Sequence, residues 1–403
     1  MNAPSLFAPW TSPQAESRET AACAKKRWRH PARPQRASAQ QPHELNFREA
    51  RARAVNPTVR VETAGTGLEG GDGCKPYRSG VPRSTRPMRF GTIALFGRSN
   101  VGKSTFLNTV LQQDLAIVSS RPQTTRDALL GVLTRDDVQM AFVDTPGVHR
   151  PKTELGQRMN HAAFETARTT DAVLFMTDVG CLLGRGRKAG EDPIDPEDRD
   201  LIQRLPAPKN VPTLLLVNKV DLLRDKGRLL PLLSAFQDAR NFHAIIPLSA
   251  VNGDGSERVL AELTPLMPEG PPGYPADTLT DRPSSYFARE YVREQVLAAT
   301  AGEVPHAVAV SVDRYEEGPV VRILATLHVD KVGQRRILVG NGGSKIKEIG
   351  SAARSRIEAL IGQKVYLELF VRVSPRWKDT PRQLAELGYS AGPAADERSR
   401  ERP

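Results

Sequence analysis

The sequence predicts two domains of different classes, an α/β domain with a mostly parallel sheet and a smaller α+β domain. Between residues 88 and 265, short apolar runs alternate with amphipathic helical patterns, which favours a parallel sheet with helices on both faces. The proline-rich stretch Pro265–Pro275 then interrupts regular structure, because proline fixes φ and lacks an amide donor. Beyond it, the pattern is helix, strand, strand, helix, helix, strand.

Five apolar runs bounded by turn residues are the expected strands of the first domain. They are Thr92–Phe96, Val138–Val143, Ala172–Asp178, Thr213–Asn218 and Ala244–Leu248. Helical periodicity separates them, for example over Leu155–Arg168 and Leu222–Asp238. The stretch Gly180–Arg199 is polar and carries charges of both signs, so we expect an exposed loop there.

The second domain is expected to follow a linker. Its predicted elements are a helix near Ser285–Ala299, strands Ala307–Tyr315, Val320–Val329 and Lys364–Val373, and two helices around a second glycine loop. The later of these two helices should bury Ile346, Ile349, Ala353, Ile357 and Leu360. We place the domains at 88–265 and 283–390, the linker at 266–282, and a polar tail at 391–403.

Residues 1–87 differ in amino-acid composition from the rest of the chain. They hold 15 of the 57 Lys and Arg residues but only 7 of the 46 Asp and Glu residues, so most of the net charge of +11 lies there. Their Ala, Arg, Pro, Gly and Ser content predicts disorder. Three interpretations stay open: a transit peptide, against which the acidic residues count, an RNA-binding arm, or a segment outside a native protein that starts at Met88.

Composition also bounds the location. Cys23, Cys74 and Cys181 are too widely spaced for a metal site or a disulfide framework, which suits a reducing cytoplasm. The longest apolar stretches are far too short to span a bilayer, and no signal-peptide pattern follows Met1. We therefore expect a cytoplasmic protein, and the basic balance, with a pI near 9.7, indicates an anionic partner.

The loop after the first strand carries a phosphate-binding motif. Residues 97–104 match G-x-x-x-x-G-K-[ST] between a predicted strand and a predicted helix. Glycines allow the backbone amides to turn toward phosphate, and the helix N-terminus adds its dipole. We expect Lys103 to reach the β and γ oxygens and Ser104 to bind Mg²⁺. The expected contacts here are Gly97, Arg98, Ser99, Asn100, Val101, Gly102, Lys103, Ser104 and Thr105.

Residues after two later strands indicate that the base is guanine. Asp221, in the run Asn218-Lys219-Val220-Asp221, can accept from N1–H and the 2-amino group of guanine, whereas adenine offers no donor at either position. A site built on such groups discriminates strongly, because the wrong ligand leaves a buried polar group unpaired. Asn218 and Lys219 should brace the loop, and Ser249 and Ala250 should complete the base pocket through backbone amides.

Two further segments predict the metal site and the switch. Asp144-Thr145-Pro146-Gly147 closes the second strand, where Asp144 should hold Mg²⁺ through water and the Gly147 amide should sense the γ-phosphate. Within residues 123–127, Thr125 should complete the metal sphere. We expect this loop, the first switch, and residues 147–160, the second switch, to change between ordered and disordered states with the bound nucleotide. Lys103, Thr125 and Gly147 are the expected catalytic groups.

Val148 predicts slow intrinsic hydrolysis. It stands where some GTPases carry a glutamine that orients the attacking water, and valine cannot do this. Hydrolysis must then depend on backbone groups, another side chain, a partner or a bound ion. Asn100 is a candidate ligand for a monovalent cation such as K⁺.

The second glycine loop predicts contact with single-stranded nucleic acid. Gly340-Asn341-Gly342-Gly343 is a G-x-x-G turn between two helices, followed by Lys345 and Lys347. Small residues let a nucleic-acid backbone approach closely, as in KH domains. Residues 340–378 hold eight Lys and Arg against three Asp and Glu, a local basic surplus.

Taken together, the motifs resemble the Era family of bacterial ribosome-assembly GTPases. The matching segments are G-R-S-N-V-G-K-S-T, Q-T-T-R, D-T-P-G-V-H, N-K-V-D, P-E-G-P with a following T-D-R, V-G-N-G-G-S-K-I-K-E-I-G and L-E-L-F-V-R-V…W…L-G-Y, between Arg89 and Tyr389. The resemblance implies a Ras-like GTPase domain and a type II KH domain. It also implies GTP or GDP with Mg²⁺, binding near the 3′ end of small-subunit rRNA on the small ribosomal subunit, and peripheral association with the inner membrane.

The predicted function is a GTP-hydrolysing switch that binds small-subunit rRNA in one nucleotide state and releases it in another. We expect no stable oligomer. Three alternatives stay open at this point: an RNA-binding assembly chaperone with little hydrolysis, a membrane-associated signalling GTPase, and an ATPase with the same phosphate-binding loop.

Overall fold

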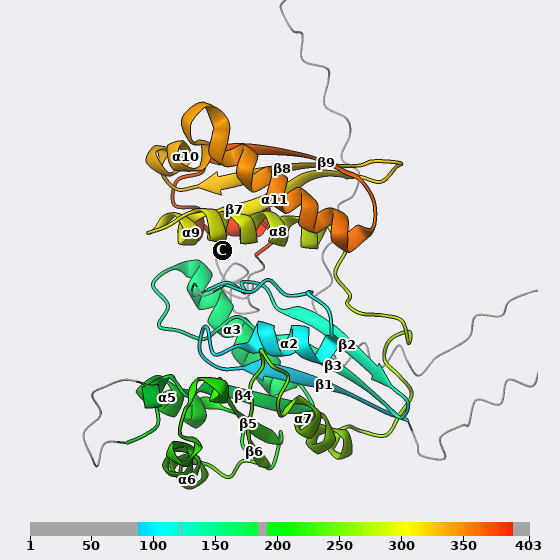
Figure 1. Ribbon diagram of the computed structural model, residues 1–403, viewed down its shortest axis with the longest axis vertical. Helices are drawn as coiled ribbons and strands as arrows, with labels where there is room; N and C mark the ends of the chain where they lie inside the picture. Colours follow the sequence, from blue (N-terminus) through cyan, green and yellow to red (C-terminus); the bar gives the residue numbers. More distant parts are fainter. Residues whose placement is uncertain (1–87, 120, 122, 184–191, 390–403) are drawn as a thin grey trace, which may run out of the picture. The chain divides into compact units, whose positions relative to one another are not determined.

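The computed structural model describes residues 88–119, 121, 123–183 and 192–389 (Figure 1). All of these residues belong to one compact unit. The predictions made for residues 1–87 and for the tail at 391–403 lie outside the described residues.

The first domain is built on a six-stranded sheet in the order β2-β3-β1-β4-β5-β6. All neighbouring strands are parallel except β2 and β3, which pair antiparallel. The strands are β1 (Arg89–Phe96), β2 (Leu129–Arg135), β3 (Val138–Asp144), β4 (Ala172–Asp178), β5 (Thr213–Asn218) and β6 (Ala244–Pro247).

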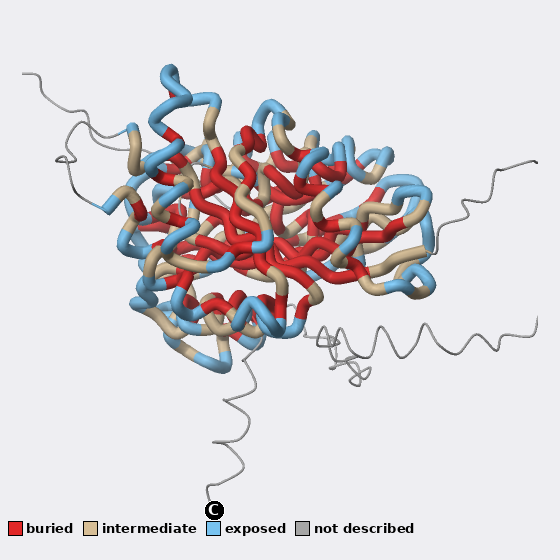
Figure 2. Tube along the Cα trace, turned by 90° about the horizontal axis from the view of Figure 1, so that it is seen from below, coloured by how far each residue is buried: buried red, intermediate tan, exposed pale blue. Residues whose placement is uncertain are grey.

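Helices cover both faces of this sheet, as the alternating pattern predicts. Successive β1 residues point to opposite faces: Ile93 and Leu95 join a core with α2 and α7, whereas Ala94 and Phe96 join a core with α3, α5 and α6. The helices are α2 (Lys103–Leu111), α3 (Glu154–Thr169), α4 (Gly180–Leu183), α5 (Pro196–Arg204), α6 (Leu229–Ala239) and α7 (Ser256–Leu263). Nearly all residues of β1, β4 and β5 are buried, and buried positions gather in the interior of the molecule (Figure 2).

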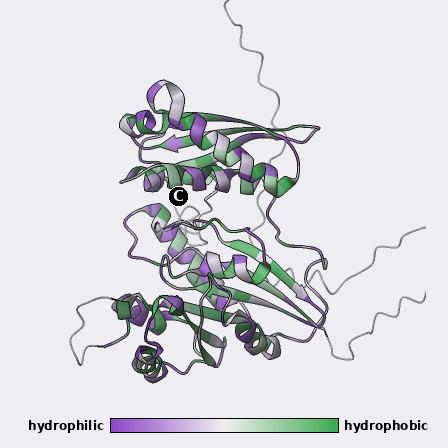
Figure 3. Cartoon of the chain, in the orientation of Figure 1, coloured by the Kyte–Doolittle hydropathy of each residue, from purple (hydrophilic) through white to green (hydrophobic). Residues whose placement is uncertain are grey.

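The second domain has the predicted elements in the predicted order, with two short helices added, α9 before β7 and α12 after β9, and its sheet is three-stranded, β7-β8-β9. β8 pairs antiparallel with β7 and parallel with β9. The elements are α8 (Ser284–Ala299), α9 (Val304–Ala307), β7 (Ala309–Glu316), β8 (Val321–Val329), α10 (Val332–Val339), α11 (Ser344–Ile361), β9 (Val365–Val373) and α12 (Pro381–Glu386). Hydrophobic residues concentrate on its strands and on one side of its helices (Figure 3).

The segment between the domains is irregular, as its prolines predict, but it is anchored to the first domain. Phe90 N donates to the Pro268 carbonyl and Val132 N to the Leu279 carbonyl, at 3.0 and 2.8 Å. The Phe90 ring also meets Tyr274 edge-on, with centroids 6.0 Å apart. These contacts hold both ends of the segment against the sheet.

Three expectations about elements were wrong. The stretch Gly180–Arg199 is not all exposed loop, because α4 and α5 occupy its ends and Ile194 is buried. The helix expected from Leu222 begins only at Leu229, after two short 3₁₀ turns at Val220–Leu222 and Lys226–Arg228. In α11, Leu360 is exposed although Ile349, Ala353 and Ile357 are buried.

Candidate nucleotide-binding site and second glycine loop

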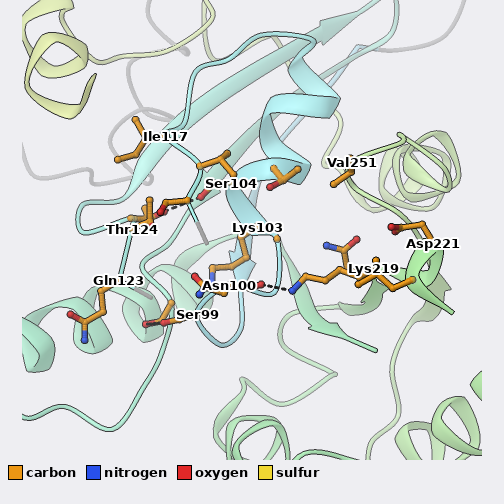
Figure 4. Close-up of a pocket in the computed structure, with 18 residues that line it drawn as sticks. Ser99, Asn100, Lys103, Ser104, Ile117, Gln123, Thr124, Lys219, Asp221 and Val251 are labelled. Carbon is orange, nitrogen blue, oxygen red and sulfur yellow. Dashed lines mark hydrogen bonds between the residues drawn. The ribbon is translucent and has the colours of Figure 1, made fainter. Parts of the chain in front are cut away.

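A cavity of about 520 Å³ lies beside the loop that follows β1 (Figure 4). It brings together residues from four of the segments predicted from sequence, far apart along the chain. The lining residues are Ser99, Asn100, Gly102, Lys103, Ser104, Thr105, Ile117, Val118, Ser119, Gln123, Thr124, Thr125, Gly147, Asn218, Lys219, Asp221, Leu222 and Val251.

The two glycines of the first motif are required by the backbone. Gly97 and Gly102 have φ of 147° and 107°, a region that side chains rarely adopt. A Cβ at Gly97 would lie 2.2 Å from the Met176 carbonyl oxygen, and one at Gly102 would lie 2.2 Å from Nδ2 of Asn218. The loop therefore packs closely on β4 and β5 and delivers the N-terminus of α2 to the cavity.

Lys103 is the buried cation of this loop. Its side chain is 6% exposed, and Nζ donates to the carbonyls of Gly97 and Arg98 at 3.1 and 2.8 Å. Burial lowers the pKa of Lys103 to about 8, and Asp144 opposes this shift. A phosphate group in the cavity would supply the negative charge that the buried ammonium lacks.

The three predicted metal residues converge. Ser104 Oγ donates to Asp144 Oδ2 at 2.6 Å, Thr125 Oγ1 donates to the same oxygen at 3.2 Å, and the two hydroxyls are 2.9 Å apart. Asp144 is fully buried, which raises its pKa against the opposing effect of Lys103. Its other oxygen, Oδ1, is buried with no hydrogen-bond partner among the described residues. An oxygen-rich group with an unpaired carboxylate oxygen fits Mg²⁺ with its waters.

The other end of the cavity is braced by Asn218 and Lys219, as predicted. Asn218 Nδ2 donates to the Val101 carbonyl at 2.7 Å. Lys219 Nζ donates to the Asn100 carbonyl at 2.7 Å (Figure 4). Lys219 also forms a salt bridge of 2.5 Å with Asp178. Sequence reasoning missed Asp178, although it ends β4 directly beside Asn218 in the strand register.

The carboxylate predicted to bind the base, Asp221, has a hydrogen-bond partner at one of its two oxygens. Asp221 Oδ1 accepts from Ser249 Oγ at 2.6 Å. Leu222 and Val251 flank the cavity and are 52% and 77% exposed, which makes them apolar edges for a planar ring. Sequence reasoning missed both, since it placed Leu222 at the start of a helix and gave Val251, which follows the buried Ala250, no role.

Some predicted contacts are placed elsewhere. Ser249 and Ala250 are each 1% exposed, and the Ala250 amide donates to Asn218 Oδ1 at 2.9 Å, so this amide is already engaged. The Arg98 side chain pairs with buried Asp198 at 2.7 Å and does not line the cavity. Val101, Thr145 and Pro146 do not line it either; Thr145 Oγ1 donates to the Leu95 carbonyl.

The second glycine loop has the backbone that its sequence predicts. Gly340, Gly342 and Gly343 have φ of 72°, 57° and 82°. A Cβ at Gly340 would lie 2.7 Å from Cβ of Lys345, whereas one at Gly342 would meet nothing within 4 Å. Asn341, Gly342 and Lys347 are exposed, and Lys345 pairs with Glu348 at 3.0 Å. The tip of the loop is therefore open to a ligand.

Comparison with known proteins agrees with this arrangement. A family model described as 50S ribosome-binding GTPase matches residues 92–219, and a KH domain model matches residues 303–378. GTPase Era from Staphylococcus haemolyticus is 40% identical over 303 residues, covering 74% of this chain and 96% of that protein. The chain belongs to the Era family. It is accordingly a GTPase with a Ras-like domain followed by a KH domain, which confirms the predicted fold class and enzyme class.

Solved structures of Era have the same architecture. An Aquifex aeolicus Era variant bound to GDP and AlF₄⁻ matches with a TM-score of 0.70 at 33% identity, over 75% of this chain and 100% of that one. Era in complex with MgGDPNP and nucleotides 1506–1542 of 16S ribosomal RNA gives the same TM-score, identity and coverage. Within the described part of this Era-family chain, none of the helices has the length and apolar character needed to cross a bilayer.

Proposed function

We propose that this Era-family GTPase binds the 3′ end region of small-subunit rRNA through its KH domain and acts in small-subunit assembly. The observation that carries the proposal is one chain that joins a cavity lined by residues of the phosphate-, metal- and base-binding motifs to an open three-glycine loop within the segment that matches a KH domain. The Era structure that contains 16S rRNA nucleotides supports the choice of RNA.

For the nucleotide we propose GTP or GDP with Mg²⁺. Ser104, Thr125 and Asp144 would hold the metal, which when bound would neutralise phosphate charge. Lys103, Thr125 and Gly147 would act on the γ-phosphate. The orphaned Asp144 oxygen and the buried Lys103 ammonium support these roles, because both lack the opposite charge that MgGTP supplies. Asn100 remains our candidate for a K⁺ ligand, and 88–265 and 283–390 remain our proposed domain limits.

For the RNA we propose contact along the second glycine loop. Gly340, Asn341, Gly342 and Gly343 would let the strand approach the backbone, and Lys345 and Lys347 would pair with its phosphates. The loop is exposed, and no side chain of the described residues caps the first turn of α11 at Gly343. Lys345 would have to leave Glu348, an exposed pair of low strength.

We further propose that nucleotide state sets RNA affinity, because the segment around Thr125 is bonded to the second domain. Arg121 Nε donates to the Leu297 carbonyl at 2.9 Å. Arg293, which is 1% exposed, donates to the Thr124 carbonyl. The residue before the proposed metal ligand is thus held by a fully buried arginine of α8.

The residues after Thr125 are held in the same way. Arg126 is 5% exposed and donates to the Val308 carbonyl at 2.7 Å, and Asp127 accepts from Arg289 at 2.5 Å. Breaking such buried charged contacts is costly, so the segment and α8 should move together. A change at Thr125 when the γ-phosphate is lost would then reach the KH domain.

Crosslinking with sequencing of the bound RNA, compared between GTP and GDP, tests the proposal. We expect 3′ end fragments of small-subunit rRNA, crosslinked at residues 340–347. The variant Gly342→Asp should abolish this RNA binding, because its carboxylate repels phosphate. The protein should still fold, since a Cβ at this position meets no atom of the described residues within 4 Å. Gly362→Asp is the matched control, since Gly362 also has positive φ and open space but lies at the far end of α11. Equal binding by both variants would refute the proposed RNA site.

We place the protein in the cytoplasm, with peripheral association at the inner face of the membrane kept as an expectation from the family resemblance. We propose no stable oligomer. Cell fractionation tests this placement. It would be contradicted if most of the protein sedimented with membranes even after a salt wash.

A further inference from the structure

The residue after Gly147 takes no part in the nucleotide cavity. Val148 is 4% exposed and belongs to the core formed with Ala94, Phe96 and Phe164. Its amide donates to the Gly97 carbonyl at 3.1 Å, so the backbone holds the side chain in the core. Whatever orders the second switch around Gly147 must come from other residues.

The side chains of Gln123 and His149 link the first switch to the second beside Val148. Gln123 Nε2 lies 2.9 Å from His149 Nε2, and His149 Nδ1 lies 3.1 Å from the Gly147 carbonyl oxygen. Gln123 and Gly147 both line the nucleotide cavity. Gln123 also has φ of 62°, a conformation that costs energy for a residue other than glycine.

The chemistry of the three groups fixes one direction of hydrogen bonding. A carbonyl can only accept, so His149 must donate to Gly147 from Nδ1. In neutral histidine the other ring nitrogen then accepts, which matches the amide N–H of Gln123. In the row of hydrogen bonds from Gln123 through His149 to Gly147, each donor therefore meets an acceptor.

The His149 residue is held on both its backbone and its ring. Asn160 of α3 donates to the His149 carbonyl at 2.7 Å and accepts from the His149 amide at 3.3 Å. Gly156, in the first turn of α3, leaves room for the ring: a Cβ there would lie 3.2 Å from His149 Nε2. That is tighter than ordinary van der Waals contact, so the ring would have to give way.

We propose that Gln123 and His149 form a clasp between the two switches that positions the Gly147 peptide for GTP hydrolysis. Both are positioning residues that act through Gly147. The glycine itself cannot be replaced, because a Cβ would lie 2.5 Å from Cα of Ser99. The clasp does the ordering that the buried Val148 side chain cannot do. It concerns hydrolysis alone and is independent of the RNA proposal.

Variants that break one bond at a time test the clasp. Gln123→Ala removes the bond between the switches. His149→Asn removes the same bond, because the shorter side chain can still donate to the Gly147 carbonyl but no longer reaches Gln123. Each should lower kcat about two- to tenfold, the range of one neutral hydrogen bond. The double variant should fall no further than either single one, since all three lack the same contact.

Gly156→Ala provides a test that separates positioning from stability. Alanine should favour the helix over glycine, so thermal stability should be kept or increased. Its methyl group should nevertheless displace the His149 ring and lower kcat by a similar factor. Gln157→Ala is the matched control, because Gln157 is an exposed glutamine of the same helix, and it should leave kcat unchanged.

Two further measurements do not depend on turnover. All clasp variants should bind GDP as the parent protein does but bind a non-hydrolysable GTP analogue more weakly. Amide hydrogen exchange at residues 147–149 should be faster in Gln123→Ala than in Gln157→Ala without nucleotide. Unchanged kcat in both Gln123→Ala and His149→Asn, strictly additive losses in the double variant, or an equal loss of GDP affinity would each overturn the proposal.

Discussion

Asp221→Asn should change the base that the protein selects. In the parent protein, Asp221 Oδ1 accepts from Ser249 Oγ at 2.6 Å, so this oxygen has one lone pair and Oδ2 has both for the N1–H and 2-amino donors of guanine. Hydrogen bonds to a charged group contribute about 1.5–3 kcal/mol each. Because Asp221 is exposed and its charge is screened, we discount each bond to about 1–2 kcal/mol, which gives about 2–4 kcal/mol for the pair. The expected loss of GDP affinity is therefore about 30- to 1,000-fold.

The same variant should gain affinity for xanthine nucleotides. Xanthine carries an acceptor where guanine carries the 2-amino group, so the Asn amide can donate to it while its carbonyl accepts from N1–H. Competition against a fluorescent GDP analogue measures both affinities. A loss of GDP affinity below threefold, or a loss with no gain for XDP, would refute the assignment of Asp221 as the base-reading residue.

Three other predictions follow from the site and its contacts. Nucleotide binding at pH 8 should take up about half a proton, and almost none at pH 6.5, because the pKa of Lys103 is about 8 and phosphate restores the charged form. Calorimetry in buffers of different ionisation enthalpy measures this proton uptake. Lys103→Met should abolish the uptake. Asp127→Asn breaks the ion pair with Arg289 and should bring RNA affinities in the GTP and GDP states closer together, as measured by fluorescence anisotropy. Gly340→Ala should lower the free energy of unfolding by about 1–3 kcal/mol, because φ is 72° and Cβ would meet Lys345, and unchanged melting would contradict this.

Strongly apolar strands and motif loops could be predicted from the sequence. The strand over Ala172–Asp178 has the predicted bounds, since an unbroken apolar run between turn residues has few other solutions. The strand Leu129–Arg135 was missed. It is an antiparallel edge strand interrupted by Gly131, where a Cβ would lie 2.5 Å from Leu111. The glycine that weakens the strand pattern is needed so that α2 can pack closely.

The side chains at the cavity were predictable where their chemistry follows a motif, and not where it depends on the fold. Ser104, Thr125 and Asp144 came from three motifs and meet within hydrogen-bonding distance. The arginines around Thr125 could not be foreseen, because Arg293 and Arg126 bond to backbone carbonyls, which carry no sequence signal. The same holds for the bond between Gln123 and His149, which depends on how two loops lie.

The central claim is that the nucleotide's terminal phosphate controls how firmly the KH domain holds RNA. The most direct test is the affinity of the full chain for a 3′ end fragment of small-subunit rRNA, measured with a GTP analogue, with GDP and without nucleotide. Coupling between two sites is typically about 5- to 150-fold, so we predict at least about a fivefold difference between the GTP-analogue and GDP states. Equal affinity in all three conditions would contradict the account.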